Sequence, residues 1–190
     1  MTIKYPFPKK ATNSKQLKTR TYGMLLENEL NITNEYYRIN NKALIYKKPT
    51  PVQVVKVDYK SRSTAKIIEA YYRTPSTTDY NGIYRGRYID YEAKETNNPR
   101  FAFKHIFPHQ IEHLKSVYDN GGISFVLIYY KKINEVILID ANKFYELYKQ
   151  GEAGGVKSIS IEKALEIGTL IKKGYTPPLD YLLAVDKIYF

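Results

Sequence analysis

The chain has 190 residues, the size of one domain or of one domain with an appendage. It has no cysteine, which excludes disulfides and thiolate metal sites, and its net charge of +11 favours a polyanionic partner such as nucleic acid, anionic lipid or an acidic protein. No run of about 18 apolar residues is present, and the N-terminal segment is polar and basic. We therefore expect no transmembrane helix, no secretory signal and no membrane partner, but a cytoplasmic protein.

The N-terminal third begins with a basic stretch rich in proline, threonine and asparagine. Residues 1–20 are interpreted as a flexible tail, either a solvated leader or an arm that contacts DNA. Apolar residues at helical spacing then predict a helix over 21–41. Strands are expected at 43–46 and 52–59, on either side of a segment with two prolines that favours an extended connection. The apolar stretch 66–72 is left open between helix and strand.

The rest of the chain alternates between period-two and helical patterns. We expect strands at 79–84, 87–94, 123–130 and 135–140, helices at 108–119, 141–149, 161–167 and 179–188, and a glycine-containing loop at 152–157. Because helices and strands interleave, the sequence indicates the α/β class.

One short segment gathers charge on one side of a predicted strand. Side chains alternate between the two faces of a strand, so Asp90, Glu92 and Lys94 share one face. Asp79 begins the strand that leads into this one, and pairing of the two strands would bring it to Glu92. Two neighbouring carboxylates repel unless a cation lies between them.

Carboxylate oxygens suit Mg²⁺, which binds one or two carboxylates together with water and substrate phosphate. Lys94 would then polarise or deprotonate the attacking water. The spacing alone is weak evidence, since Glu-x-Lys arises by chance and balances charge on many solvated strands. His109 and His113 have a spacing that can bind zinc, but ordinary polar packing is the favoured interpretation.

Longer segments carry a family resemblance. Residues 76–84 (STTDYNGIY) and 86–96 (GRYIDYEAKET) strongly resemble the RecU family of Holliday junction resolvases. Residues 47–53 (KKPTPVQ) resemble the segment that enters the stalk of that family, and residues 109–113 (HQIEH) resemble its following helix. The likeness extends from about residue 20 to the C-terminus.

This resemblance implies a restriction-endonuclease-like core with a central mixed β-sheet flanked by helices. It also implies a homodimer that cuts four-way junctions with Mg²⁺, or Mn²⁺ as a substitute. Carried over by position, Asp79 and Glu92 are metal ligands and catalytic residues, and Lys94 is the catalytic lysine. Thr78 and Gln110 map to the surroundings of the metal, although the spacing from Glu92 to Gln110 is one residue shorter than the family pattern.

The resemblance also implies a single nuclease domain over 21–190 with a projecting stalk at about 47–74. Basic side chains neutralise phosphates, and tyrosines between them can stack on unpaired bases. The predicted DNA-binding set consists of Lys47, Lys48, Lys56, Lys60, Arg62, Lys66, Arg73 and Arg87. The alternative is a two-stranded hairpin with an ordinary solvated face.

Taken together, the sequence predicts a structure-selective endonuclease of DNA recombination and repair that resolves four-way junctions by paired nicks. Candidate protein partners are a branch-migration motor and a recombinase. Two other classes stay open, namely a non-catalytic protein that binds and bends branched DNA, and a basic protein associated with RNA.

Overall fold

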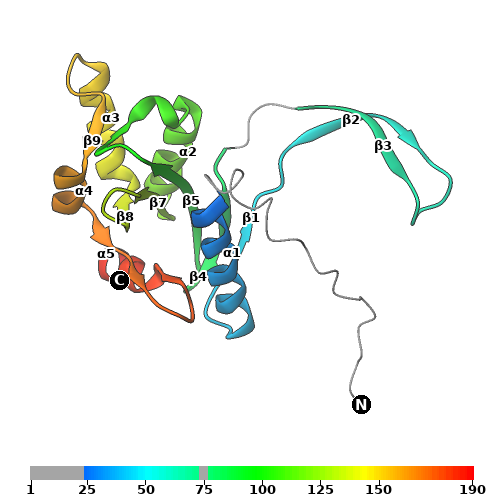
Figure 1. Ribbon diagram of the computed structural model, residues 1–190, viewed down its shortest axis with the longest axis horizontal. Helices are drawn as coiled ribbons and strands as arrows, with labels where there is room; N and C mark the ends of the chain where they lie inside the picture. The colour runs from blue at the N-terminus through cyan, green and yellow to red at the C-terminus, as the bar shows by residue number, and fades with distance from the viewer. Residues whose placement is uncertain (1–23, 73–76) are drawn as a thin grey trace, which may run out of the picture.

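The computed structural model describes residues 24–72 and 77–190 (Figure 1). The predicted tail at 1–20 and Arg73 lie outside the described residues. Within them, helices and strands interleave around a central sheet, which confirms the α/β prediction.

Six strands form a mixed sheet in the order β1-β4-β5-β7-β8-β10. They are β1 (Leu44–Lys47), β4 (Tyr80–Tyr84), β5 (Arg87–Thr96), β7 (Ile123–Tyr130), β8 (Glu135–Asp140) and β10 (Thr169–Leu170). The pair β5–β7 is parallel and the other neighbours are antiparallel. Arg85 and Gly86 both have positive φ, as a tight two-residue hairpin turn between β4 and β5 requires.

Each face of the sheet buries its own apolar layer. Along β7, Phe125 and Leu127 belong to one layer, while Val126 and Ile128 belong to the other. The first layer is covered by α1 (Met24–Ile39) and α5 (Leu182–Tyr189). The second is covered by α2 (Pro108–Asp119), α3 (Ala141–Glu152) and α4 (Ile161–Ile167). The sheet is therefore buried on both faces, and the central strand β5 lies between two helical layers.

Two helices on the second face begin at side-chain caps. Asp140 accepts hydrogen bonds from the backbone N–H groups of Asn142 and Lys143 at the start of α3. Ser160 accepts one from the backbone N–H of Lys163 at the start of α4. These caps satisfy amide donors that would otherwise lack partners in the first helical turn.

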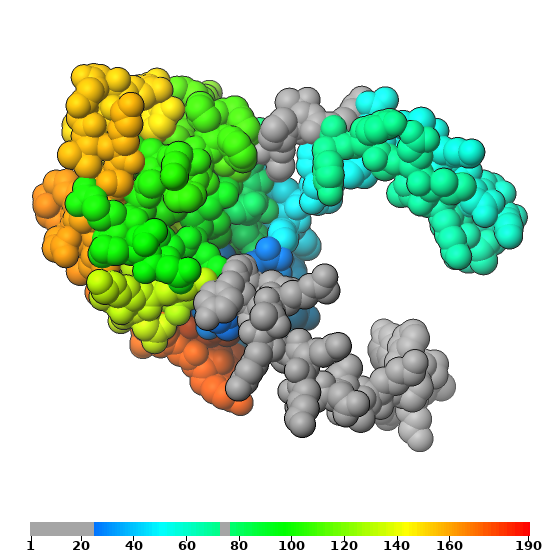
Figure 2. Space-filling model, turned by 45° about the horizontal axis from the view of Figure 1, so that its top comes forward, coloured from blue at the N-terminus to red at the C-terminus, as the bar shows by residue number. Residues whose placement is uncertain are grey.

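The stalk is a two-stranded antiparallel hairpin of β2 (Val52–Asp58) and β3 (Lys66–Tyr72). It projects from the edge of the body next to β1 and stands clear of it in the space-filling view (Figures 1 and 2). All residues of both strands are exposed, including valines, isoleucines and tyrosines. The segment 66–72, left open from the sequence, is therefore a strand.

Short elements account for the differences from the predicted pattern. The 3₁₀ turn Phe103–His105 and five strands were not predicted: β6 (Arg100–Ala102), β9 (Ser158–Ser160), β10, β11 (Lys172–Lys173) and β12 (Leu179–Asp180). The last helix begins at residue 182 rather than 179, because Leu179 pairs with Lys173. The third helix extends to Glu152, which shortens the predicted loop.

Candidate active site

The register between β4 and β5 brings the two predicted catalytic carboxylates together. Tyr80 pairs with Tyr91, so Asp79 lies one step further along, opposite Glu92. The backbone N–H of Ala93 donates to Asp79 Oδ2 at 3.3 Å, which fixes the Asp79 carboxylate beside β5. The pairing that the sequence suggested is thus present in the structure.

Glu92 is a buried carboxylate with two different oxygens. Its side chain has no exposed surface, and Oε1 accepts from Lys94 Nζ at 2.6 Å and from Gln110 Nε2 at 3.0 Å. Oε2 has no hydrogen-bond partner among the described residues. Burial raises the pKa of Glu92 to about 7, with a further rise from the charge of Asp79, against the lowering effects of Lys94 and Gln110.

This donor set fits a divalent cation. A buried carboxylate oxygen without a partner costs free energy, and a nearby second carboxylate adds repulsion that a cation removes. Within residues 24–72 and 77–190, no group of three His, Cys, Asp or Glu side chains is placed to hold a metal ion. Two carboxylates with water and substrate phosphate completing the shell match the preference of Mg²⁺.

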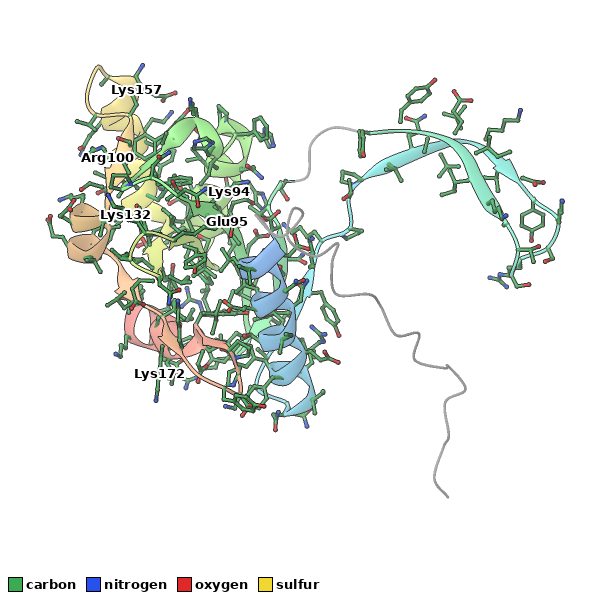
Figure 3. The ribbon with its side chains drawn as sticks, viewed as in Figure 1. Lys94, Glu95, Arg100, Lys132, Lys157 and Lys172 are labelled. Atoms are coloured by element: carbon green, nitrogen blue, oxygen red, sulfur yellow. The ribbon has the colours of Figure 1, made fainter. Side chains whose placement is uncertain are left out.

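Lys94 lies on the same strand face as Glu92, two residues further along β5. Its side chain is 26% exposed, so its ammonium reaches the surface while contacting Glu92. Figure 3 labels Lys94 next to Glu95, whose side chain alternates to the other face of the strand and pairs with Lys131 at 2.8 Å. Lys94 is therefore the cation of β5 that borders the carboxylate pair.

Gln110, predicted in the surroundings of the metal, joins the site through a contact with Glu92. Its Oε1 accepts from the backbone N–H of Phe107 at 3.1 Å, and its Nε2 donates to Glu92. The amide oxygen is thus engaged at the start of α2, and the amide nitrogen orients the Glu92 carboxylate.

Asp90, to which the sequence reading gave no role, is the centre of a second polar cluster on the same face. It is fully buried and accepts from Lys48 Nζ at 2.7 Å, from Tyr88 Oη at 2.7 Å and from Thr78 Oγ1. His113 Nε2 lies 3.2 Å from Asp90 Oδ2.

Burial by itself would raise the pKa of Asp90, but the hydrogen bonds from His113, Lys48, Thr78 and Tyr88 outweigh it and hold the pKa below its usual value. Asp90 is therefore held as a carboxylate. The signal in the sequence was its place on the strand face of Glu92, but its partners come from distant segments.

The seven predicted DNA-binding residues that the structure describes separate into three groups. Lys56, Lys60, Arg62 and Lys66 are exposed on the stalk, and Lys47 forms a half-exposed ion pair with Glu27 at its root. Lys48 is mostly buried against Asp90, so its ammonium is used within the chain.

Arg87 is also used within the chain. Its guanidinium donates to the backbone carbonyls of Gly121, Gly122 and Tyr189 and lies over the ring of Phe190. Lys48 and Arg87 are therefore withdrawn from the proposed DNA surface, because their donors already have intramolecular acceptors.

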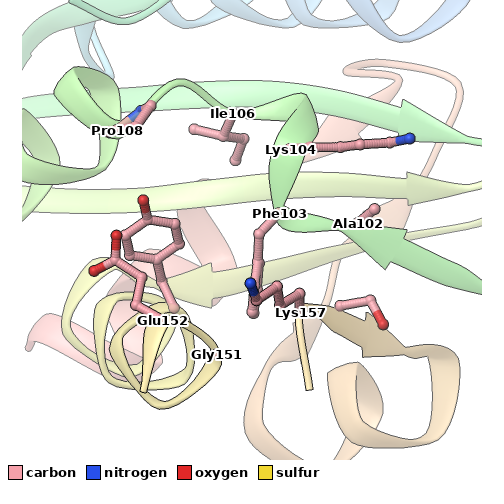
Figure 4. A pocket seen from close by; sticks show the side chains of 10 residues that line it. Ala102, Phe103, Lys104, Ile106, Pro108, Gly151, Glu152 and Lys157 are labelled. Carbon is pink, nitrogen blue, oxygen red and sulfur yellow. The ribbon is translucent and has the colours of Figure 1, made fainter. Parts of the chain in front are cut away.

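A separate cavity of about 610 Å³ lies between β6, the start of α2 and the end of α3 (Figure 4). Phe103 and Tyr148 contribute apolar surface, and Lys104, Lys157 and Glu152 contribute charge. The described residues that line it include none of the predicted catalytic residues, so the cavity is not assigned to the reaction.

Among the described helices, none is long and apolar enough to cross a membrane.

Comparison with known proteins connects this geometry to a family. The family model described as Recombination protein U matches residues 21–187. Proteins named Holliday junction resolvase RecU from Bacillus thuringiensis (strain Al Hakam), Bacillus cereus (strain AH820) and Bacillus anthracis (strain A0248) are each 47% identical over 199 aligned residues, covering 100% of this chain and of the relative. The chain therefore belongs to the RecU family.

Proposed function

We propose that this protein is a metal-dependent endonuclease that resolves four-way DNA junctions by paired nicks during DNA recombination and repair. The observation that carries the proposal is the buried Glu92 carboxylate, which faces Asp79 and Lys94 and keeps one oxygen without a hydrogen-bond partner among the described residues. A protein that only binds or bends DNA has no use for such a costly arrangement. The names of its full-length relatives agree with this activity.

Asp79 and Glu92 would hold the cation, which we propose to be Mg²⁺ with Mn²⁺ as a substitute. Bound there, the metal would stabilise the negative charge that builds on the phosphate during hydrolysis. Thr78 and Gln110 were predicted as further ligands. The Thr78 hydroxyl donates to Asp90 and the Gln110 amide donates to Glu92, so we propose the two carboxylates as the charged ligands, with Thr78 and Gln110 beside them.

Lys94 supplies the cationic side of the site. In hydrolysis, the water oxygen bonds to phosphorus, the bond to the leaving oxygen breaks, and that oxygen takes a proton. The Lys94 ammonium, at 2.6 Å from Glu92 Oε1, is placed to orient the water and to balance charge on the phosphate. Gln110 keeps Glu92 in position, so the carboxylate does not rotate away during the reaction.

The stalk supplies the proposed contact with the substrate. Lys56, Lys60, Arg62 and Lys66 present cationic groups on a ribbon that also exposes tyrosines. We propose that cations contact phosphates and tyrosines stack on bases at the open centre of a junction. A homodimer would supply two identical centres for the two nicks, and a branch-migration motor and a recombinase are its proposed partners. A DNA substrate also implies a cytoplasmic enzyme.

The test is cleavage of a synthetic four-way junction, with linear duplex of equal length as the matched control. With Mg²⁺ or Mn²⁺ present, we expect paired nicks in opposed strands of the junction and little cutting of the duplex. With a chelator, we expect binding without cutting. Binding without cutting at any concentration of either metal would instead favour a non-catalytic junction-binding protein.

A further inference from the structure

The two chain segments that join the stalk to the body are linked to each other through one side chain. The outgoing segment leaves β1 at Lys48, whose backbone N–H donates to the carbonyl of Asp79 at 2.8 Å. The returning segment re-enters the body at Thr77 and Thr78. Lys48 Nζ donates to Thr77 Oγ1 at 3.0 Å and to Thr78 Oγ1 at 2.6 Å, so it bridges the two segments.

The same ammonium makes its third contact with Asp90 on the central strand, at 2.7 Å. An ammonium has three N–H donors, and Thr77, Thr78 and Asp90 account for all three. The Lys48 side chain is 14% exposed and that of Asp90 is fully buried. We call Lys48, Thr78 and Asp90 the root clasp. Loss of one partner of a buried ion pair leaves an uncompensated charge. Opening the root clasp therefore costs more free energy than breaking a contact on the exposed hairpin.

The root clasp is adjacent in sequence to both proposed metal ligands. Thr78 directly precedes Asp79, and Asp90 lies two residues before Glu92 on the same face of β5. Among the described residues, β2 and β3 pair with each other and not with the six-stranded sheet. A displacement of the stalk is therefore transmitted to the body through the two segments that join them. The root clasp lies at these segments and connects them to the strand that carries Glu92.

We infer that Asp90 is a positioning residue: with Lys48 and Thr78 it holds both roots of the stalk against β5, so that seating of the stalk in a junction sets the position of Asp79 for cutting. The inference rests on the proposed function and adds to it a physical link between junction recognition and cleavage. A shift of about 1 Å at a reacting centre can cost about a hundredfold in rate, so a loose root is sufficient to impair cutting.

The first test compares Asp90→Asn with Tyr88→Phe in the full-length protein. Both change the hydrogen bonds of the same carboxylate, but the Tyr88 hydroxyl bonds to Asp90 and Asn81, which both lie on strands of the central sheet. The measurements are the junction dissociation constant in Mg²⁺-free buffer and the single-turnover cutting rate at saturating protein. For Asp90→Asn we expect a rate at least tenfold lower with affinity within about threefold, and for Tyr88→Phe a rate within about twofold of the original protein.

Equal losses in the two variants, or a rate for folded Asp90→Asn within about twofold of the original, would overturn the inference. If Asp90→Asn does not fold, Thr78→Val tests the same link, because it keeps the side-chain shape and removes the hydroxyl. If the root clasp positions Asp79, Thr78→Val should slow cutting without changing the Mg²⁺ concentration that gives the half-maximal rate. A higher Mg²⁺ requirement would mean that Thr78 is a metal ligand and would contradict the clasp.

Transmission from the stalk is tested by a double-mutant cycle. Arg62→Ala near the stalk tip is measured alone and together with Asp90→Asn. If the clasp transmits seating, the tip variant slows cutting less in the Asp90→Asn background than in the original protein. Strictly additive effects would refute transmission. Absence of cutting by the unmodified protein would instead refute the proposed nuclease function, so the two failures are distinguishable.

Discussion

Gln110 Nε2 and Lys94 Nζ both donate to Oε1 of Glu92, at 3.0 Å and 2.6 Å, whereas Oε2 of the same carboxylate has no hydrogen-bond partner among the described residues. A helix and a strand thus fix the orientation of one carboxylate from two sides. Glu92 would contact the proposed metal, whereas Gln110 and Lys94 orient its carboxylate. The two roles can be tested separately.

Gln110→Leu should weaken metal binding without removing a metal ligand. Leucine approximates the volume of the side chain but cannot hold Glu92 Oε1, so the carboxylate gains freedom. We expect the Mg²⁺ concentration for half-maximal cutting to rise about tenfold, the size of effect seen when a group that orients a metal ligand is lost. Junction affinity without metal should not change. Ser116→Ala, on the exposed side of the same helix, is the control, and equal behaviour of the two variants would count against the role of Gln110.

Lys94→Ala should slow cutting strongly while metal still binds, because the two carboxylates remain. We expect the single-turnover rate to fall by about a hundredfold or more, as for loss of a group that stabilises charge in the transition state. Mn²⁺ binding, measured by calorimetry, checks that the metal site survives. A cutting rate equal to that of the original protein would exclude Lys94 from the reaction.

Glu92→Gln should stabilise the metal-free protein at high pH. The pKa of Glu92 is raised from 4.5 to about 7, so the neutral acid suits the folded state. Its contribution to stability is fully present below pH 4.5 and is lost as pH rises through 7, where the charged form must stay buried. At about 1.4 kcal/mol per pKa unit, the loss is on the order of 3 kcal/mol.

The gain in melting temperature of Glu92→Gln over the original protein, measured with a chelator, should therefore increase from pH 5 to pH 8. Asp79→Asn is the comparison. It removes the charge of Asp79, which raises the pKa of Glu92, but it leaves Glu92 buried. A gain that is the same at both pH values would show that Glu92 titrates normally in the folded protein.

Junction binding and its salt dependence should both weaken when alanine replaces four stalk cations together, namely Lys56, Lys60, Arg62 and Lys66. Each lost phosphate contact should reduce the log–log salt slope by roughly 0.9. If the stalk enters the open centre of a junction, affinity for junctions should fall more than affinity for duplex of equal length. Competition binding at several salt concentrations measures both, and parallel loss would exclude the stalk as the source of selectivity.

Arg87→Ala should affect stability rather than DNA binding. Its guanidinium donates to three backbone carbonyls and packs on the C-terminal aromatic rings, so removal leaves carbonyl acceptors unpaired. We expect a loss of about 1–3 kcal/mol in the free energy of unfolding, with an unchanged salt slope for junction binding. A lower slope at unchanged stability would restore Arg87 to the DNA-binding set.

The sequence predicted most of the fold because its long elements have clear periods. The alternation of Asp90, Glu92 and Lys94 with Ile89 and Tyr91 identified the strand face that carries the proposed catalytic residues, and the pairing of 79–84 with 87–94 followed from the turn between them. The short strands β6 and β9 were not predictable, since three residues are too few for a period and their pairing joins distant segments.

Side-chain partners were the other part that sequence reading did not reach. Lys48 and Arg87 belonged to the basic set by charge alone, and only three-dimensional proximity to Asp90 and to the backbone carbonyls shows where their donors go. Gln110 was assigned to the metal from its position in the family pattern. Its amide orientation depends on the helix start at Phe107, which spacing does not define.

The most direct test of the account is the single-turnover cutting rate of Glu92→Gln on a four-way junction with saturating Mg²⁺, with binding measured in the same samples. The substitution keeps shape and volume but removes the charge that faces Asp79 and Lys94. The account predicts that cutting is abolished while the junction dissociation constant stays close to that of the original protein. Cutting at the original rate by a folded Glu92→Gln protein would contradict the proposed active site.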